Sequence, residues 1–150
     1  MDKIDRLDHA ILKEVGHNGR ISVTDLANRV GLSNTPCTLR LRRLEELGYI
    51  RGYRAILDPE KMGVGHIAFV QVTLTDTKTA ALEAFNKAVR QISEVEQCHM
   101  TCGGFDYLLK VRSRDIADYR QVMGEKISTL PYLSHTSTFV VMETVKDSHL

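Results

Sequence analysis

Residues 22–52 constrain the fold of this chain more than any other segment. A short apolar stripe of helical period ends at Gly31, which is suited to terminate a helix. A longer helix is predicted to follow, beginning at a cap on Ser33 or Thr35 and closing at Gly48. Two helices joined by so tight a turn predict a helix-turn-helix, in which the second helix enters a groove of DNA.

The faces of this longer helix have different chemistry. At about 100° per residue, one face collects apolar side chains that can pack on earlier helices, namely Cys37, Leu41 and Leu44. The opposite face carries Thr38, Leu39, Arg42 and Arg43. Base edges are read near the N-terminus of a recognition helix, here by Asn34, Thr35, Thr38, Leu39 and Arg42.

Two of these side chains suggest how bases would be recognised. An arginine such as Arg42 can bind guanine O6 and N7 together, which discriminates against other bases by roughly 1–3 kcal/mol. An outward Leu39 suits contact with a thymine methyl, although a single surface leucine is also ordinary in proteins. Arg40 and Arg43 flank the reading face, where they suit phosphates or the neighbouring Glu45 and Glu46.

The charge distribution supports a basic patch in the first half. Residues 1–57 hold ten Lys/Arg and seven Asp/Glu, a net charge of +3, whereas residues 58–150 hold ten and twelve, a net charge of −2. Six arginines lie between Arg29 and Arg54, including Arg51 and Arg54, which are further phosphate candidates. A local basic patch is what a nucleic-acid surface needs, but charge alone equally fits a solvated helix face.

The rest of the first half completes a three-helix head. Asp5 can cap a first helix, with Asp8 at its acidic third position. Ser22 can cap the second helix, with Asp25 in the equivalent place. Residues 49–57 then predict a short strand pair, which would form a wing beside the helices.

The second half changes to a mixed strand and helix pattern. Strands are predicted over residues 67–74, 95–102, 105–111 and 136–145, and helices over residues 79–92 and 115–127. The order β-α-β-β-α-β is the ferredoxin-like arrangement. We therefore expect an α+β chain with a winged helix-turn-helix at 1–58, a linker at 59–65 and an αβ-sandwich at 66–150. Two helices cover one face of a four-stranded sheet, so the other face predicts an oligomer.

Composition places the chain among cytoplasmic globular proteins. Its apolar content of 43% and charged content of 26% are ordinary, and it has no apolar run long enough to span a membrane. The first residues lack the apolar core of a signal peptide, and three cysteines do not make a disulfide framework. Reduced thiols and a cytoplasmic location are expected.

No metal centre or cofactor is expected. Cys98 and Cys102 are four residues apart with His99 between them, but no second ligand pair has metal-binding spacing. On a strand, the two cysteines would share one face while His99 points to the other, which favours core thiols. Phosphate-binding loops and catalytic motifs are missing from the sequence, so an enzyme is not expected.

Several segments together resemble a known family of regulators. They are Leu32-Ser-Asn-Thr-Pro-Cys37, Arg40-Leu-Arg-Arg-Leu-Glu45, Gly48 through Pro59, Gly103 through Val111 and Thr136-Ser-Thr-Phe-Val140. In this order they are similar to the leucine-responsive/asparagine-responsive (Lrp/AsnC) family, nearer the leucine-responsive type. The resemblance implies a DNA-binding transcriptional regulator of amino-acid metabolism that forms dimers, often assembled into octamers, and responds to a small effector, mostly an amino acid.

The resemblance also implies where DNA binds. The family's helix-turn-helix carries over onto Val23 through Arg42, and the flanking arginines extend it. With the residues chosen above, the implied DNA-binding set is Val23, Thr24, Ser33, Asn34, Thr35, Pro36, Thr38, Leu39, Arg40, Arg42, Arg43, Arg51 and Arg54.

The implied effector site lies at the turn between the second and third strands of the sensing domain, where dimers meet. Its residues here are Thr101, Cys102, Gly103, Gly104 and Asp106, with Thr136 and Thr138 on the last strand. Backbone N–H groups of a Gly-Gly turn suit an α-carboxylate, and Asp106 suits an α-ammonium. The same residues also fit a simple tight turn. Many relatives carry a polar or acidic residue in place of Gly104, so effector identity stays open.

Two other classes compete with an effector-responsive regulator. One is a nucleoid-architectural protein that wraps DNA without responding to an effector, although a reading face of Thr38, Leu39 and Arg42 argues against it. The other is a metabolic enzyme that uses the second half as a small-molecule domain, and no catalytic pair supports it.

Overall fold

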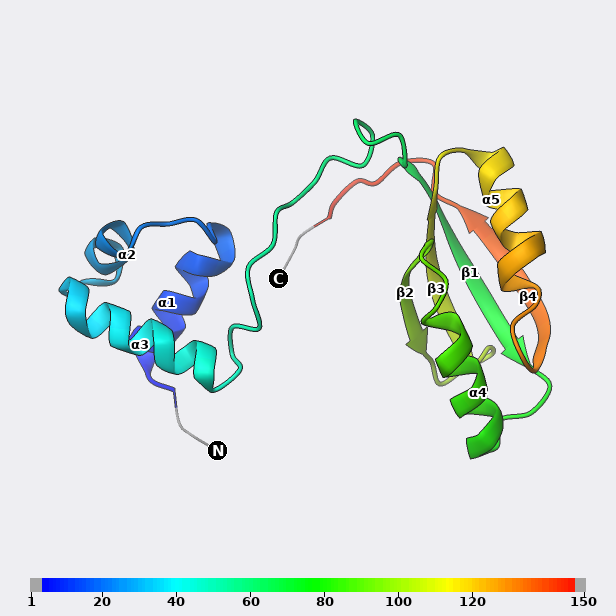
Figure 1. Ribbon diagram of the computed structural model, residues 1–150, viewed down its shortest axis with the longest axis horizontal. Coiled ribbons are helices and arrows are strands. Elements are labelled where there is room, and N and C mark those ends of the chain that lie inside the picture. The colour runs from blue at the N-terminus through cyan, green and yellow to red at the C-terminus, as the bar shows by residue number, and fades with distance from the viewer. Residues whose placement is uncertain (1–3, 148–150) are drawn as a thin grey trace. The chain divides into compact units, whose positions relative to one another are not determined.

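The computed structural model describes residues 4–147, which fall into two compact units. One unit ends at Ile56, and the other is Leu57–Asp147. The first unit is helical, and the second combines a sheet with helices (Figure 1). No helix within residues 4–147 combines the length and apolar character needed to span a bilayer.

The first unit is a three-helix head. Its helices are α1 (Arg6–His17), α2 (Val23–Val30) and α3 (Asn34–Glu46). Two predicted caps are confirmed: Asp5 forms a capping box with Asp8 on α1, and the Ser22 hydroxyl accepts from Asp25 N on α2. Ser33 takes the N-cap position of α3, as one of the two predicted alternatives, but its side chain makes no capping hydrogen bond. Each helix contributes to one apolar core made of Ile11, Leu26, Ala27, Cys37 and Leu44.

The predicted strand pair in residues 49–57 is wrong. No strand forms there, and the backbone of residues 51–57 makes no hydrogen bond with the rest of the described chain. The segment has the β-branched and aromatic composition of a strand, but a ladder needs a partner of complementary register, which residues 4–147 do not supply. Gly48, at φ +78°, instead turns the chain out of α3 as predicted.

The second unit is an antiparallel sheet with helices on one face (Figure 1). Its elements are β1 (His66–Leu74), α4 (Thr79–Val89), β2 (Val95–Met100), β3 (Tyr107–Ser113), α5 (Ile116–Val122), the π-helical turn η1 (Met123–Ile127) and β4 (Leu133–Val140). The strand order is β2-β3-β1-β4, and every neighbouring pair is antiparallel. The predicted βαββαβ order is therefore confirmed.

The two faces of this sheet differ sharply in burial. Alternate residues of β1 and β3 are buried against Phe85 of α4 and Tyr119 of α5. The other face, which we call the open face, carries Phe69 and its cross-strand partner Phe139, whose side chain is 53% exposed. The described residues leave this face without a covering layer.

Several strand ends differ from prediction, and the third strand, Tyr107–Ser113, lies two residues later than the predicted 105–111. The last strand is Leu133–Val140 rather than 136–145, because its register on β1 runs from Leu74 to Ala68 and little of β1 remains beyond Ala68 to pair with it. The strand predicted over residues 95–102 ends at Met100, so Cys102 lies in the following turn. Cys98 and Cys102 are both exposed, and the expectation that they are core thiols is wrong.

Candidate nucleic-acid interface and effector site

The N-terminal half of α3 presents a reading face to solvent. Leu39 is 62% exposed and Arg42 is exposed, while Thr38 is half-buried. Cys37 and Leu44, on the other face, are fully buried in the head. The prediction from a rotation of about 100° per residue therefore separated the inner and outer faces of α3 correctly.

Side-chain hydrogen bonds tie the start of α3 to α2. The Asn34 amide donates to Thr24 Oγ1 over 3.2 Å, and the Thr38 hydroxyl donates to the Asn34 carbonyl over 2.9 Å. Among the other implied turn residues, Ser33 and Thr35 are exposed, whereas Val23 and Pro36 are half-buried. This network fixes the first turn of α3, and the Thr38 oxygen still has acceptor capacity.

Within the head, Arg40 and Arg43 pair with Asp5 and Asp8 rather than with Glu45 or Glu46. Arg40 donates to Asp8 over 2.8 Å and to Asp5 over 2.7 Å, and Arg43 lies 3.5 Å from Asp8. The expected pairing with Glu45 or Glu46 is therefore wrong, whereas the alternative of phosphate contact stays a prediction. Glu45 instead accepts from the Tyr53 hydroxyl over 2.9 Å. Burial, followed by that hydrogen bond and the Glu45 charge, raises the pKa of Tyr53 to about 12.

Asp8 binds two arginines of α3, a role that the sequence analysis did not predict. Its side chain is only 1% exposed, and it takes part in the capping box of α1 while receiving Arg40 and Arg43 of α3. A carboxylate buried to this extent needs such partners, because an unpaired buried charge is costly. Asp8 and Arg40 are 32 positions apart in the sequence, so no local pattern could have indicated their ion pair.

Three arginines of the implied DNA-binding set remain available. Arg42, Arg51 and Arg54 are exposed, and none forms an ion pair within residues 4–147. Arg42 lies on α3, whereas the other two lie on the extended segment after it. Free guanidinium groups of this kind suit bidentate recognition of guanine or phosphate.

The β2–β3 turn uses Asp106 to hold its own shape. Asp106 Oδ2 accepts from Leu74 N over 2.7 Å, and its backbone N–H donates to Val72 O over 2.9 Å. Thr101 closes the turn, since its N–H donates to Asp106 O and its hydroxyl donates to Phe105 O. Asp106 Oδ1 has no hydrogen bond within the described residues, so one carboxylate oxygen is left for a ligand.

The tip of this turn is open to solvent. Gly103, Gly104 and Cys102 are exposed, and a Cβ added to either glycine would meet no atom within 4 Å. Neither glycine has a positive φ, so the backbone itself does not require glycine there. The missing side chains leave free space beside the backbone N–H groups.

Thr136 and Thr138 are not brought to this turn within one chain. They lie on β4, separated from β3 by β1, with Thr136 opposite Val72. Because Val72 and Val70, their partners on β1, are buried under the helices, both threonines point to the helix-bearing face, and their strand lies two spacings of about 4.8 Å from β3. The Thr138 hydroxyl is also engaged with Tyr119 Oη at 2.6 Å.

Comparison with known proteins agrees with both halves of the chain. Residues 4–51 match the family model described as winged helix-turn-helix DNA-binding, and residues 67–150 match that of the Lrp/AsnC ligand binding domain. The chain is 59% identical to the proline dehydrogenase transcriptional activator of Rhizobium radiobacter, over 98% of this chain and 94% of that protein. It is 46% identical to the leucine-responsive regulatory protein of Escherichia coli K12, over 97% and 89%.

A solved structure also has this architecture. A transcriptional regulator of Neisseria meningitidis, determined as an L-methionine complex, superposes with a TM-score of 0.92 at 32% identity, over 97% of this chain and 94% of that one. The matched profiles cover the head and the sheet in the order found here. The chain therefore belongs to the Lrp/AsnC family of DNA-binding transcriptional regulators.

Proposed function

We propose that this protein controls a gene of amino-acid catabolism by binding its operator through α3 and sensing an amino acid through the second unit. The observation that carries the DNA half is the exposed face of α3, with Leu39 uncovered and Arg42 unpaired within the described residues. In this assignment residues 1–58 bind DNA, residues 59–65 link the domains, and residues 66–150 sense the effector and oligomerise.

The relatives suggest the target gene and the first effector to test. A protein 59% identical over nearly the whole chain is named a proline dehydrogenase transcriptional activator. We therefore propose the proline dehydrogenase gene as the target and proline as the first candidate effector. The N. meningitidis regulator was solved with L-methionine, which supports an amino acid as the ligand class.

The proposed contacts with DNA are of two kinds: some side chains read the bases, and others bind phosphates and position the protein. Asn34, Thr38, Leu39 and Arg42 face base edges, and Arg51 and Arg54 contact phosphates. Val23, Thr24, Ser33, Thr35 and Pro36 shape the turn that presents them. Arg40 has both of its carboxylate partners within the head, so we assign it and Arg43 to the orientation of α3 rather than to base reading.

Effector binding is proposed at the tip of the β2–β3 turn. The N–H groups of Gly103 and Gly104 would hold the α-carboxylate, and the free oxygen of Asp106 the α-ammonium. Thr136 and Thr138, which lie opposite the buried Val72 and Val70, point away from the open face and would reach the same ligand from a subunit of another dimer. A ligand shared between subunits can change DNA affinity because it favours one assembly over another.

The proposed assembly is a homodimer built on the open face, with octamers as a higher state. The protein acts in the cytoplasm without a metal or cofactor, and regulation rather than catalysis is its role. Dimers present two heads, which suits half-sites about one helical turn apart.

Mobility-shift titrations test this proposal. The probes are DNA from upstream of the proline dehydrogenase gene and a scrambled version of the same length, each at several salt concentrations with and without proline. We expect tighter binding to the upstream DNA and a change in affinity or in sedimentation when proline is added. Equal affinities and equal salt slopes for both probes would favour DNA wrapping without specificity instead.

A further inference from the structure

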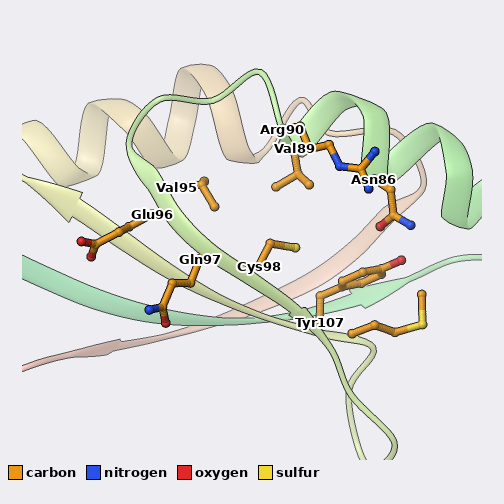
Figure 2. Close-up of a pocket in the computed structure, with 9 residues that line it drawn as sticks. Asn86, Val89, Arg90, Val95, Glu96, Gln97, Cys98 and Tyr107 are labelled. Carbon is orange, nitrogen blue, oxygen red and sulfur yellow. The ribbon is translucent and has the colours of Figure 1, made fainter. Parts of the chain in front are cut away.

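A cavity of about 500 Å³ lies between α4 and β2, on the helix-bearing face of the sheet (Figure 2). Cys98 pairs with Leu109 and Met100 pairs with Tyr107, so both β2 side chains point to that face. β2 is the edge strand of the sheet, and both side chains are partly uncovered: Cys98 is exposed and Met100 is 56% exposed. The volume falls within the range of small-molecule sites.

One end of the cavity carries a buried hydroxyl group beside a side-chain amide. Tyr107 is only 1% exposed, and the side chain within residues 4–147 that is placed to hydrogen-bond its Oη is the weakly aligned Asn86 amide. Its ring is held against Phe85, with centroids 4.4 Å apart. Figure 2 shows Tyr107 and the Asn86 amide at the same end of the cavity. A phenol hydroxyl can both donate and accept, so Tyr107 and Asn86 together leave capacity for a further polar atom of a ligand.

The charge of the lining favours an anion. Arg90, which follows α4, makes no ion pair within the described residues. The one acid in the lining, Glu96, is already bound by Lys110 at 3.1 Å and Arg112 at 3.2 Å. Burial works to raise the pKa of Glu96, but these two cations together lower it, so Glu96 stays ionised and occupied.

We propose that this cavity binds a small monocarboxylate with an apolar body and no α-ammonium group. Arg90 binds the carboxylate, Val89, Val95 and Met100 contact the apolar body, and the Asn86–Tyr107 end accepts a second polar atom where the ligand has one. An α-ammonium would find no free carboxylate in the lining, which distinguishes this site from the amino-acid site proposed at the β2–β3 turn.

Thiol protection in the full-length chain tests the proposal. Cys98 lines the cavity and Cys102 lies in the turn, and both are exposed, whereas Cys37 is buried. Alkylation of Cys98 and Cys102 is followed separately by tandem mass spectrometry as 3-methylbutanoate is added. We expect saturable slowing at Cys98 and little change at Cys102. 3-Methylbutylamine and L-leucine, which have similar apolar bodies but carry an ammonium group, should leave Cys98 unprotected at the same concentration.

Two variants on α4 and its end make the result specific. R90A should raise the 3-methylbutanoate concentration for half-protection by about tenfold or more, as expected when a charge-assisted contact is lost. K87A, an exposed cation on the same helix that does not line the cavity, should leave it unchanged. No protection by the carboxylate, or equal protection in wild type and R90A, would overturn the proposal. Protection of Cys102 by an amino acid would bear on the effector site proposed at the β2–β3 turn and not on this cavity.

Discussion

At the scale of single residues, Arg42 and Arg54 are both exposed and free of ion pairs in the described chain, but they lie on different elements. Arg42 lies on the reading face of α3, so R42A should weaken binding to the specific operator by roughly 1–3 kcal/mol and relax base preference at one position. Affinity for operator variants, each changed at one base pair, measures both effects.

R54A provides the matched comparison, because Arg54 is assigned to a phosphate. It should weaken specific and scrambled DNA alike and reduce the slope of log affinity against log salt by about one unit. Binding measured across salt concentrations for the two variants therefore distinguishes a base contact from a phosphate contact. Identical behaviour of R42A and R54A would contradict that division.

For Asp8 we expect an effect on stability, because its ion pairs are within the protein. D8A removes a carboxylate that is 1% exposed and leaves Arg40 with only the exposed Asp5. We expect a loss of about 2 kcal/mol or more in the free energy of unfolding, less than for a fully buried pair because Arg40 keeps some solvent. Urea unfolding measures this loss. D25A, an exposed first-turn acid of α2, serves as the control and should cost about 1 kcal/mol or less.

At the scale of elements, the sequence predicted features that arise from nearby residues. The caps at Asp5 and Ser22 and the faces of α3 depend on spacings of three or four residues, and all are confirmed. The ends of β2 and β4 and the absence of strands in residues 49–57 depend on where a partner strand lies, which local composition does not encode.

The same difference applies to the candidate sites. The outward position of Leu39 followed from helical periodicity, but the partners of Arg40 did not, because Asp8 is 32 residues away. The open turn at Gly103 was predictable from glycine content. The hydrogen bond from Leu74 N to one carboxylate oxygen of Asp106 was not predictable, because it depends on how β1 lies beside the turn.

The start of α5 carries a pH prediction. The Arg114 guanidinium at 2.8 Å and the Arg114 N–H at 2.9 Å lower the pKa of Asp118 to about 2. The folded state therefore binds this proton more weakly than the unfolded state, whose pKa is near 4. The stabilisation is present above that value and is lost as pH falls toward 2. Carboxyl NMR should give the low pKa.

Thermal unfolding across the same pH range checks the sign. D118N should be less stable than wild type at neutral pH, and the difference should shrink toward pH values of about 2, where wild-type Asp118 also becomes protonated. E83Q is the control, since Glu83 is exposed and has no hydrogen bond or ion pair in the described chain. A D118N difference that does not vary with pH would contradict the expectation.

At the scale of the whole molecule, the open face connects the sheet to DNA binding. It carries Phe69 and Phe139 on neighbouring strands and has no covering layer within residues 4–147. A second copy placed on this face would bury these rings and join two heads. Linked heads bind two half-sites with a large gain over one, because the second contact becomes intramolecular.

F139E should therefore convert the dimer to a monomer in sedimentation experiments, because it places a charge in the proposed interface. Affinity for a two-half-site operator should fall by roughly 10²–10⁴-fold, while affinity for a single half-site should change little. I116E is the matched control: Ile116 is 58% exposed but lies at the start of α5, on the helix layer. It should leave both assembly and binding intact. If F139E remains dimeric while folded by circular dichroism, the two chains meet on another surface, and the effector shared between subunits must be placed anew.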